Sequence, residues 1–402
     1  MANRFRLFHQ PFRARFLNRP NRFLILCELR GRKVAAFLPN PGRLQELLLP
    51  GCTVHLVEEG SRNRKYRYTA VAVERDHQPI MLHTHRSNDV ARYLLEHDLI
   101  PELEKAKVIQ SEVVVGRSRF DFLLEDGAGK FILEIKSCTL VGKKVAMFPD
   151  AVTERGARHL RELAELAQNG IRTAVVFVVH WPFAEVFMPD YHTDLNFSRI
   201  LLDVRGRVKL IPLAVHWGPD LSLLPGARRL GIPWDYVQQE AQDRGSYLLI
   251  LRLQKGMKLE VGRLGRVSFE GGYYVYVGSA MANLTQRIER HRRLRKQHHW
   301  HIDELREVAE LHAALAIRSS DRLECEIARA LSIISNWAIP GFGCTDCSCP
   351  THLFGMRDDP LRSTPFQRFL QYFRMDRYEE HPSPGSNDEN RSGDGQSIDF
   401  LP

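Results

Sequence analysis

Residues 118–138, SRFDFLLEDGAGKFILEIKSC, set two apolar runs around the turn-forming sequence EDGAGK. Runs rich in Phe, Ile and Leu favour β-strands, and a glycine-containing turn between them predicts a hairpin. If the loop is centred on its first Gly-Ala pair, Asp121 on one strand lies opposite Glu134 on the other. Because side chains alternate between the faces of a strand, Lys136 points to the same side as Glu134. The hairpin is therefore expected to gather two carboxylates and a lysine in one patch.

This set of side chains is typical of a metal-dependent phosphodiesterase. Asp121 and Glu134 would hold a hard cation, Mg²⁺ or Mn²⁺, through oxygen ligands. The cation would polarise the phosphate and help to form hydroxide, while Lys136 positions the water or stabilises developing charge. An exposed sheet face with an ordinary salt bridge explains the same residues, so the surrounding sequence has to support one interpretation.

The composition indicates several domains and a polyanionic partner. The 402 residues are 44% hydrophobic, so we expect two to four domains. The formal net charge is +9, and six acids with one arginine from Glu379 onward give about −5, so the preceding residues carry about +14. A basic body favours nucleic acid as the partner, although solubility alone explains the same excess.

The sequence is expected to belong to a cytoplasmic protein. It contains no apolar run near twenty residues, so no transmembrane helix is predicted. Seven cysteines in a chain of this length do not form a disulfide scaffold, which fits a reducing compartment. The beginning, MANRFRLFHQPFRARFL, lacks the apolar core of a signal peptide. It is interpreted as a basic arm along a phosphate backbone or, alternatively, as an organellar transit segment.

Residues 1–85 predict a small OB-like barrel. Five short strand-like runs are separated by turns, namely RFLILCEL, KVAAFL, TVHLVE, KYRYTAVAVE and PIMLHT. One turn interleaves charge with aromatics as a nucleic-acid groove does, through Arg62, Arg64, Lys65 and Arg67 with Tyr66 and Tyr68. A solvated hairpin with two half-buried tyrosines explains that pattern equally well. Asn40, Gly42 and Arg43 are a further candidate phosphate-binding turn.

Residues 86–224 predict a mixed sheet with helices packed on its faces. SNDVARYLLEHDLI has helical spacing, VIQSEVVVG is strand-like, and the hairpin follows. A second helix is expected within MFPDAVTERGARHLRELAELAQNG, ending near Gly170, and TAVVFVV is a buried strand. Glu154, Arg155 and His159 on the second helix are expected near the acidic patch, with Arg155 as a phosphate contact. A surface ion-pair face is the alternative for these three residues.

The order helix, three strands, helix, strand, together with Asp121, Glu134 and Lys136, resembles the PD-(D/E)XK nuclease core. Residues 13–224 also resemble the sugar fermentation stimulation protein A (SfsA) family in FLPNPGRLQELL, RFDFLL, LEIKSCTL and FPDAVTERGARHLREL. The resemblance implies an OB-like domain, a nuclease-like domain and DNA binding, with DNA favoured over RNA. It implies metal ligands at Asp121 and Glu134 and a catalytic role for Lys136. A further acid is usual in such cores, and Glu96 and Glu112 are the candidates.

The C-terminal half predicts another domain after a linker at residues 225–244. Within residues 245–358, GSYLLILRL is a strand, and LGRVSFEGGYYVYVGSA gives two strands that meet at EGG. NLTQRIERHRRLRKQ is a basic helix capped by Asn283 or Thr285, and RSSDRLECEIARALSII is a further helix. Arg287 and His291 are four residues apart, which aligns them on one helix face.

This arrangement resembles the GIY-YIG nuclease fold through Gly245-Ser246-Tyr247 and Tyr276-Val277-Gly278, followed by Arg287 and a later acid. The resemblance implies an α+β domain in which Tyr247 and Tyr276 act as base or water-positioning groups. Arg287 would contact the scissile phosphate, His291 belongs to the same catalytic set, and Glu326 is chosen as the metal-binding acid with Glu324 as its rival. Serine in place of the family's isoleucine departs from the pattern at position 246. Two strands with ordinary buried tyrosines are the alternative.

Two further clusters contain potential metal ligands. QHHWHIDEL includes His298, His299, His301 and Asp303, which could transfer protons or simply begin a solvated helix. GFGCTDCSCPTHLF contains Cys344, Cys347, Cys349 and His352, a set that Zn²⁺ favours. Four ligands within nine residues strain a closed tetrahedron, so packed or free thiols are the alternative interpretation.

Residues 359–402 are expected to be a C-terminal extension that is acidic and disordered from about residue 379, because that part is too polar to bury a core. Taken together, the sequence predicts a multidomain α/β protein that binds nucleic acid and hydrolyses phosphodiester bonds. The alternative is a non-catalytic DNA-binding regulator that uses nuclease-like folds as phosphate-binding platforms. Neither the oligomeric state nor a sugar site follows from any residue.

Overall fold

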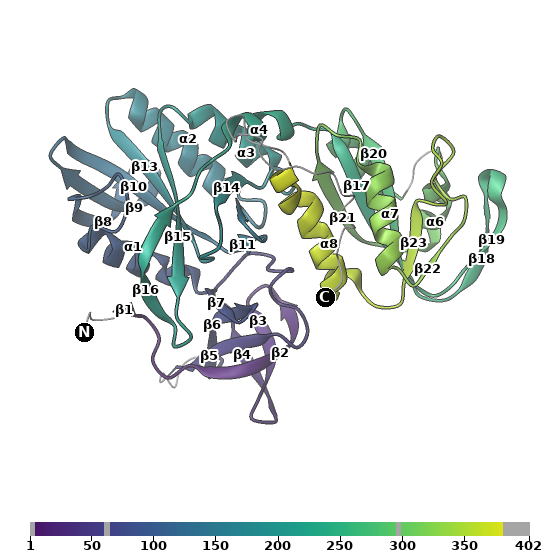
Figure 1. The fold of residues 1–402 in the computed structure, drawn as a ribbon, viewed down its shortest axis with the longest axis horizontal. Helices are drawn as coiled ribbons and strands as arrows, with labels where there is room; N and C mark the ends of the chain where they lie inside the picture. Colours follow the sequence, from purple (N-terminus) through teal and green to yellow (C-terminus); the bar gives the residue numbers. More distant parts are fainter. Residues whose placement is uncertain (1–4, 60–64, 295–298, 381–402) are drawn as a thin grey trace, which may run out of the picture. The chain divides into compact units, whose positions relative to one another are not determined.

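The structure is a computed structural model that describes residues 5–59, 65–294 and 299–380. The chain forms two compact units (Figure 1). The first combines residues 1–190 with 196–237, and the second combines residues 191–195 with 238–402. Within the described residues, no helix is both long enough and apolar enough to cross a membrane.

The first unit contains a closed barrel. Its strands are β2 (Phe12–Asn21), β3 (Leu24–Leu29), β4 (Arg32–Phe37), β5 (Thr53–Glu58) and β6 (Tyr68–Arg75), with β7 (Gln78–Met81) attached. They pair in the order β4-β3-β2-β5-β6-β7, and a parallel pairing of β4 with β6 closes the first five into a ring. Buried side chains such as Ile25, Cys27 and Val54 fill the interior. The OB-like barrel predicted from the sequence is therefore present.

The membership of the ring differs from the prediction. β2, which the sequence analysis placed in a basic arm or transit segment, is a ring strand, whereas β7 pairs with β6 outside the ring. The arginines of β2 conceal its strand pattern, because Ala14 and Phe16 are buried while Arg13 and Arg15 alternate with them on the exposed face. The short β1 (Phe5–Arg6) pairs with the mixed sheet instead.

The mixed sheet has the strand order β1-β16-β15-β13-β10-β9-β8. Its members after β1 are β8 (Lys107–Val115), β9 (Ser118–Asp126), β10 (Gly129–Cys138), β13 (Arg172–Val179), β15 (Lys209–Trp217) and β16 (Ser222–Arg229). The strands β10, β13 and β15 are parallel, and the remaining neighbours are antiparallel. A small sheet of β11 (Leu140–Val141), β12 (Val145–Phe148) and β14 (Val186–Pro189) lies apart from it.

Helices cover both faces of the mixed sheet. The helices are η1 (Thr84–Arg86), α1 (Ser87–Glu96), α2 (Glu154–Gln168) and α3 (Leu195–Val204). The apolar side of α1 packs in one core with Leu133 and Ile135, whereas α2 and α3 pack in another core with Ile132 and Val175. The helix–three strands–helix–strand order predicted from hydrophobic spacing is confirmed, with the β11–β12 hairpin inserted before α2.

The segment predicted to be an irregular linker, residues 225–244, instead contains regular secondary structure. It contains most of β16 and the helix α4 (Trp234–Glu240). Proline lacks a ladder donor, and Pro225 is tolerated because the β15–β16 register shifts at this point, with Leu224 and Arg228 paired on either side of it. Pro and Gly therefore mark a sheet irregularity here, whereas the division between the two compact units falls later in the predicted linker, between Val237 and Gln238.

The second unit is built on an antiparallel five-stranded sheet with the order β21-β17-β20-β23-β22. These strands are β17 (Gly245–Leu253), β20 (Gly272–Ala280), β21 (Glu310–Arg318), β22 (Trp337–Ala338) and β23 (Leu353–Met356). A separate hairpin joins β18 (Met257–Val261) and β19 (Gly265–Phe269) through η2 (Gly262–Leu264). The strand β21 was missed because its sequence, ELHAALAIR, has the alanine and leucine content of a helix.

Four helices cover the two faces of this sheet (Figure 1). They are α5 (Leu284–Arg292), α6 (His301–Val308), α7 (Glu324–Ile334) and α8 (Thr364–Arg374). The short helix η3 (Pro360–Arg362) precedes α8, and η4 (Asp376–Glu380) follows it. The alternating residues of β17 divide between the cores, with Leu249 facing α5 and α6 and Leu248 facing α7 and α8. The polar segment with His301 and Asp303 thus begins a packed helix.

The expected boundary at residue 358 is also wrong. Phe366, Phe369 and Phe373 of α8 are buried in the core shared with α7, so residues 359–380 complete the second unit. The predicted disorder of the acidic tail concerns residues 381–402, which lie outside the described residues.

Removing the central side chain of α8 tests this assignment. Phe369→Ala is expected to destabilise the second unit by about 3–5 kcal/mol, because it leaves a cavity in a closed core. Ile333→Ala, at a position 53% exposed on α7, is the control and is expected to change stability by less than about 0.5 kcal/mol. Urea unfolding followed by circular dichroism measures both. Equal, small effects would show that α8 is dispensable.

Candidate metal and phosphate sites

The first candidate site lies on the β9–β10 hairpin. The antiparallel register runs from Gly129 opposite Asp126 to Leu133 opposite Phe122, so Asp121 and Glu134 are the next positions along the two strands. This is the register predicted from the sequence. The acidic pair therefore lies at the end of the regular pairing between the two strands.

Asp121 is held from both neighbouring elements. Its Oδ1 accepts a hydrogen bond from Asn88 Nδ2 of α1 at 2.8 Å, and its Oδ2 accepts one from the Ile135 backbone N–H at 2.7 Å. No role in a site was predicted for Asn88 from the sequence. Its carboxamide fixes one orientation of the acid.

Glu134 is 4% exposed and receives two nitrogen donors on one oxygen. Oε1 accepts a hydrogen bond from Lys136 Nζ at 2.6 Å and lies 2.7 Å from His159 Nδ1 of α2. The other oxygen, Oε2, is buried and has no hydrogen-bond partner among the described residues. A buried carboxylate oxygen in this state is a strong candidate for a cation ligand, because leaving it unpaired is costly.

The two carboxyl groups titrate differently. Burial, and next the nearby charge of Glu134, raise the pKa of Asp121 to about 6. Burial also acts to raise the pKa of Glu134, but the Lys136 ammonium and His159 outweigh it and hold that pKa below its ordinary value. A divalent cation between the two groups would relieve their repulsion, and each Asp121 oxygen keeps a second lone pair for it. The residues therefore fit a hard cation.

Other predicted residues of the first unit divide into two groups. Arg155 is exposed, and its Nε lies 3.4 Å from His159 Nε2, so it stands next to the acidic patch as expected. Glu96 and Glu112 do not supply the further acid, because each is exposed and paired with an arginine, at 4.0 Å and 3.5 Å respectively. Asn88 is the side chain that the first helix contributes instead.

The basic residues of the barrel are partly described. Arg62 and Arg64 lie outside the described residues. Lys65 lies over the ring of Tyr66, and Arg67 lies over Tyr68 while also bonding Glu58 at 2.8 Å. The interleaving of charge and aromatic rings is thus present, with the charge of Arg67 partly neutralised.

The predicted turn at Arg43 is tightly built. The Arg19 guanidinium donates to the backbone carbonyls of Asn40, Gly42 and Arg43. Asp150 precedes α2, and its Oδ2 accepts a hydrogen bond from the Leu44 backbone N–H at 2.8 Å. A Cβ atom at residue 42 would lie 2.6 Å from that same oxygen, so only glycine allows the close approach. The turn therefore joins the barrel to the mixed sheet and leaves Arg43 exposed.

The second candidate site lies on β17 and β20. Tyr247 is opposite Gly278 in the register, and a Cβ atom at residue 278 would lie 2.5 Å from the Tyr247 hydroxyl. Glycine therefore makes room for the ring of Tyr247, which lies 6.4 Å from that of Tyr276. Both tyrosines are nearly buried. Their close packing explains the Tyr-Val-Gly spacing that the sequence analysis singled out.

A chain of polar groups continues from Tyr247. Its Oη lies 3.0 Å from Nε2 of His291, and Nδ1 of His291 lies 3.6 Å from Asp303. Burial raises the pKa of Tyr247, and also that of Tyr276, so each hydroxyl stays protonated at neutral pH. This favours the water-positioning role over the general-base role for Tyr247, whose hydroxyl lies within hydrogen-bond distance of His291 Nε2.

Two arginines of α5 lie beside this chain. Arg287 and Arg290 lie over the ring of Trp300, at 4.4 Å and 4.3 Å from its centroid, and Arg290 also pairs with Asp303 at 3.0 Å. The charges of Arg287 and Arg290 act to lower the pKa of Tyr247. Arg287 is therefore close enough for its charge to act on Tyr247, and its role at a scissile phosphate stays a prediction. Asn283 occupies the N-cap position as predicted, but its side chain makes no capping hydrogen bond, and Asp243 Oδ1 accepts from the backbone N–H of Thr285 instead.

The acid chosen for this site, Glu326, lies elsewhere. Its carboxylate is 4.0 Å from Arg377, whereas Glu324 accepts a hydrogen bond from Ser279 and contributes to the raised pKa of Tyr276. The two positions differ by two residues, about 200° around a helix, so one of them must face away. The sequence could not decide the helix register. The structure places the rival, Glu324, beside the tyrosines.

The predicted zinc ligands are corrected in one member. The ligand atoms of Cys325, Cys347, Cys349 and His352 all lie within 4.8 Å of one another, and Cys344 is not part of the group. Cys325 comes from the first turn of α7, nineteen positions before Cys344. The strain expected for four ligands in one loop is thereby removed. Cys325 lies in the segment ECEIAR, outside the cysteine-rich loop, and only the fold brings it next to that loop.

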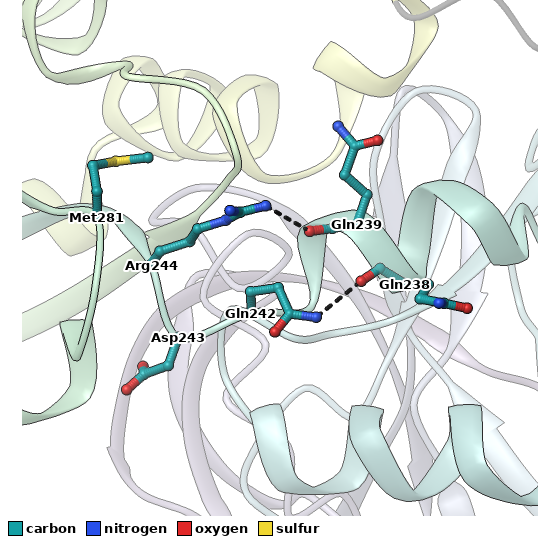
Figure 2. A pocket seen from close by; sticks show the side chains of 6 residues that line it. All are labelled: Gln238, Gln239, Gln242, Asp243, Arg244 and Met281. Carbon is teal, nitrogen blue, oxygen red and sulfur yellow. Dashed lines mark hydrogen bonds between the residues drawn. The ribbon is translucent and has the colours of Figure 1, made fainter.

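A polar pocket lies at the start of the second unit (Figure 2). It is lined by Gln238, Gln239, Gln242, Asp243, Arg244 and Met281. Two of the side chains bond to backbone carbonyls, Arg244 to residue 239 and Gln242 to residue 238. None of the predicted catalytic or metal-binding residues lines it, so this pocket is not a candidate site.

A closed five-stranded barrel followed by a mixed sheet with an acidic hairpin defines a two-part class of protein. Two family models match these parts, the SfsA N-terminal OB domain over residues 17–82 and the sugar fermentation stimulation protein RE domain over residues 85–220. A homologue from Methanothermobacter thermautotrophicus is 35% identical over 231 residues, which are 57% of this chain and 96% of that relative. The chain belongs to the sugar fermentation stimulation protein family.

Two further matches agree with this assignment. A homologue from Clostridium acetobutylicum is 39% identical over 189 residues, 47% of this chain and 82% of that relative. The structure of Pyrococcus furiosus SfsA in complex with Ca²⁺ is 30% identical with a TM-score of 0.53, and it covers 57% of this chain and 99% of that one. Residues 246–374 match a separate model, the domain of unknown function DUF123. The GIY-YIG resemblance of this region stays a prediction.

The pKa of Asp121 leads to a pH-dependent stability. Its folded value is raised above the ordinary value, so the charged form destabilises the folded state as the pH rises from about 4 through 6. Asp121→Asn is therefore expected to gain stability relative to the wild type over this window, with the difference constant above about pH 7.

Urea unfolding at several pH values measures this difference. Asp203→Asn, at a position 75% exposed on α3, is the matched control and is expected to show no such trend. A difference that is flat with pH for Asp121→Asn would contradict the raised pKa.

Proposed function

We propose that the protein binds nucleic acid and hydrolyses its phosphodiester bonds at the site formed by Asp121, Glu134 and Lys136, with Mg²⁺ or Mn²⁺. The observation that carries the proposal is the buried Oε2 of Glu134, which lacks a hydrogen-bond partner among the described residues beside a second carboxyl group of raised pKa. Folding two such groups together is unfavourable without a cation.

The metal has support from a relative. The Pyrococcus furiosus protein was solved in complex with Ca²⁺, which takes oxygen ligands as Mg²⁺ does. In this chain Glu134 and Asp121 would hold the cation. When bound, it supplies charge to polarise the phosphate and to lower the pKa of a water molecule.

The remaining side chains have roles that follow from their positions. Lys136 is 15% exposed and bonds Glu134, so it fixes that carboxylate and can reach a phosphate oxygen or the attacking water. His159 holds the same Glu134 oxygen from α2, and Arg155 extends outward from His159 toward solvent. An exposed arginine at this place suits the charge and geometry of a phosphate group.

The barrel is proposed to bind the nucleic acid backbone. Arg43, Lys65 and Arg67 are exposed on it, and the last two lie over tyrosine rings on which bases can stack. DNA is favoured over RNA by the family resemblance in the sequence. A cytoplasmic location is part of the same proposal, and the sugar in the family name corresponds to no residue of the site.

The alternative is a DNA-binding regulator without catalysis. A binder gains nothing from two buried carboxylates beside the phosphates, since without a metal they repel the ligand. The intact acidic pair therefore favours the enzyme.

Cleavage assays test the proposal. Glu134→Gln and Lys136→Ala are each expected to lower Mg²⁺- or Mn²⁺-dependent cleavage of labelled DNA by roughly 10²–10³-fold, since each removes a group that acts on the transition state. Glu112→Gln, at a position 68% exposed on β8, is the control and is expected to cleave normally. Binding of DNA and RNA is measured in parallel. Tight binding by the wild type with no cleavage under any metal would favour the regulator.

A second candidate function is supported by the second unit. A chain of polar groups runs through Tyr247, His291 and Asp303, and Arg287 and Glu324 lie beside it. These side chains would allow the second unit to hydrolyse phosphodiesters independently of the first unit. In the Glu134→Gln background, a slower metal-dependent cleavage is expected to remain. Adding Tyr247→Phe is expected to reduce that remainder roughly 10²-fold, because the hydroxyl that positions water is lost.

Tyr273→Phe is the matched control, since Tyr273 lies on β20 and packs against His312 away from the polar chain. If Glu134→Gln leaves no cleavage, or if Tyr247→Phe and Tyr273→Phe behave alike, the second unit does not hydrolyse nucleic acid by this set of residues. That result would leave the proposal for the first unit untouched.

A further inference from the structure

Four ligand side chains meet at one end of the sheet of the second unit. Cys347 and Cys349 lie in the turn-rich loop between β22 and β23, and His352 directly precedes β23. Cys325 reaches the same point from the first turn of α7. Their four ligand atoms lie within 4.8 Å of one another.

The separations fit a tetrahedral thiolate–imidazole site. Zn–S and Zn–N distances of about 2.3 Å and 2.0–2.1 Å in a tetrahedron place sulfur and nitrogen ligands roughly 3.5 Å apart. Cys347 Sγ and His352 Nε2 are 3.5 Å apart. Soft thiolates select Zn²⁺ over Mg²⁺ or Ca²⁺, which prefer oxygen. The donor type therefore separates this site from the acidic hairpin of the first unit.

The second nitrogen of His352 is also engaged in the expected way. Its Nδ1 lies 3.1 Å from Glu324 Oε1, while the side chain is 1% exposed. Histidines that bind metals usually donate the other ring N–H to a carboxylate, which fixes the tautomer and the ring orientation. Here Nε2 faces the thiols and Nδ1 faces a carboxylate, and this is the arrangement that a bound metal requires of the ring.

We propose that Cys325, Cys347, Cys349 and His352 form a structural Zn²⁺ site. Four protein ligands complete the tetrahedron, so no position is left for a substrate or an activated water. The metal fastens the loop before β23 to the beginning of α7. The three cysteines are half-buried and within reach of one another, which also suits thiolates held by a metal better than thiols packed in a core.

The site has a second consequence, which rests on the candidate function of the second unit. Glu324 bonds His352 through one oxygen and Ser279 through the other, and its charge acts on both Tyr247 and Tyr276. A Cβ atom at Gly343 in the metal-bearing loop would lie 2.9 Å from the Tyr276 ring. Zinc therefore positions Glu324 and one wall of the tyrosine site.

Metal analysis of the full-length protein tests the ligand set. Wild type and Cys344→Ser are expected to contain one equivalent of zinc after purification without chelators, whereas Cys325→Ser is expected to lose most of it. Cys344→Ser is the matched control, because Cys344 lies in the same loop but outside the group. Loss of zinc in Cys344→Ser with retention in Cys325→Ser would overturn the proposed ligands.

A second measurement covers the case in which Cys325→Ser fails to fold. Wild-type protein, stripped of metal and loaded with Co²⁺, is expected to show the intense thiolate charge-transfer and visible bands of a tetrahedral site. Glu324→Gln is expected to keep the bands and to bind Co²⁺ or Zn²⁺ roughly 10–100-fold more weakly, as loss of an outer partner does.

Three outcomes would contradict the proposal. They are a wild-type protein that binds neither metal, a cobalt spectrum without thiolate bands, and a disulfide among the three cysteines found by thiol titration without reductant. None of these measurements depends on nuclease activity, so they separate the metal site from the proposed function of the tyrosines.

Discussion

The repulsion between two largely buried carboxyl groups is the constraint on which the first unit depends. Asp121 and Glu134 meet because the hairpin register requires it, and the donors are distributed unequally between them. Glu134 receives Lys136 and His159, which keep its pKa low, whereas Asp121 receives only neutral donors and its pKa rises to about 6. A cation held by both carboxylates would relieve their repulsion. The neighbouring, exposed Arg155 would offer a phosphate group a positive charge beside this acidic patch.

The rest of each unit supports its own site by close backbone approach. In the first unit, Gly42 lets the Arg43 turn reach Asp150, which joins the barrel to the segment that begins α2, the helix of His159. In the second unit, Gly278 lets Tyr247 lie across β20, and the proposed zinc ligands hold the loop that packs on Tyr276. In each unit a side chain therefore occupies space that glycine leaves, Asp150 beside Gly42 and Tyr247 beside Gly278. Substitutions at these glycines would act on the sites through packing.

Local patterns predicted much of the fold, and their failures have physical reasons. The alternation in the hairpin was enough for its register, and helical spacing was enough for α1, α2, α5 and α7. The arginines of β2 and the alanines of β21 hid strands, because burial by the sheet overrides intrinsic preference. Pro225 and Gly226 imitated a linker in a strand irregularity, and α8 was left out although Phe366, Phe369 and Phe373 are spaced to share one helix face.

The candidate sites likewise contain some residues that local sequence patterns grouped and others that only the tertiary structure brings together. Asp121, Glu134 and Lys136 are local in sequence and could be grouped from it, as could Tyr247 and Tyr276 through their glycine spacing. Asn88, Asp303 as a partner of His291, and Cys325 come from distant elements, and no spacing rule connects them. Choosing Glu326 over Glu324 failed because two residues reverse the face of a helix, and only tertiary packing decides which face is inward.

The central claim is that Asp121 and Glu134 together hold one divalent cation, and titration with Mn²⁺ followed by electron paramagnetic resonance measures this most directly. Zinc-loaded wild-type protein is expected to show one Mn²⁺ site that is occupied at pH 7.5 and binds far more weakly below pH 6, where Asp121 is protonated. Glu134→Gln is expected to lose that site at both pH values. Equal binding by wild type and Glu134→Gln, or binding that does not depend on pH, would contradict the account.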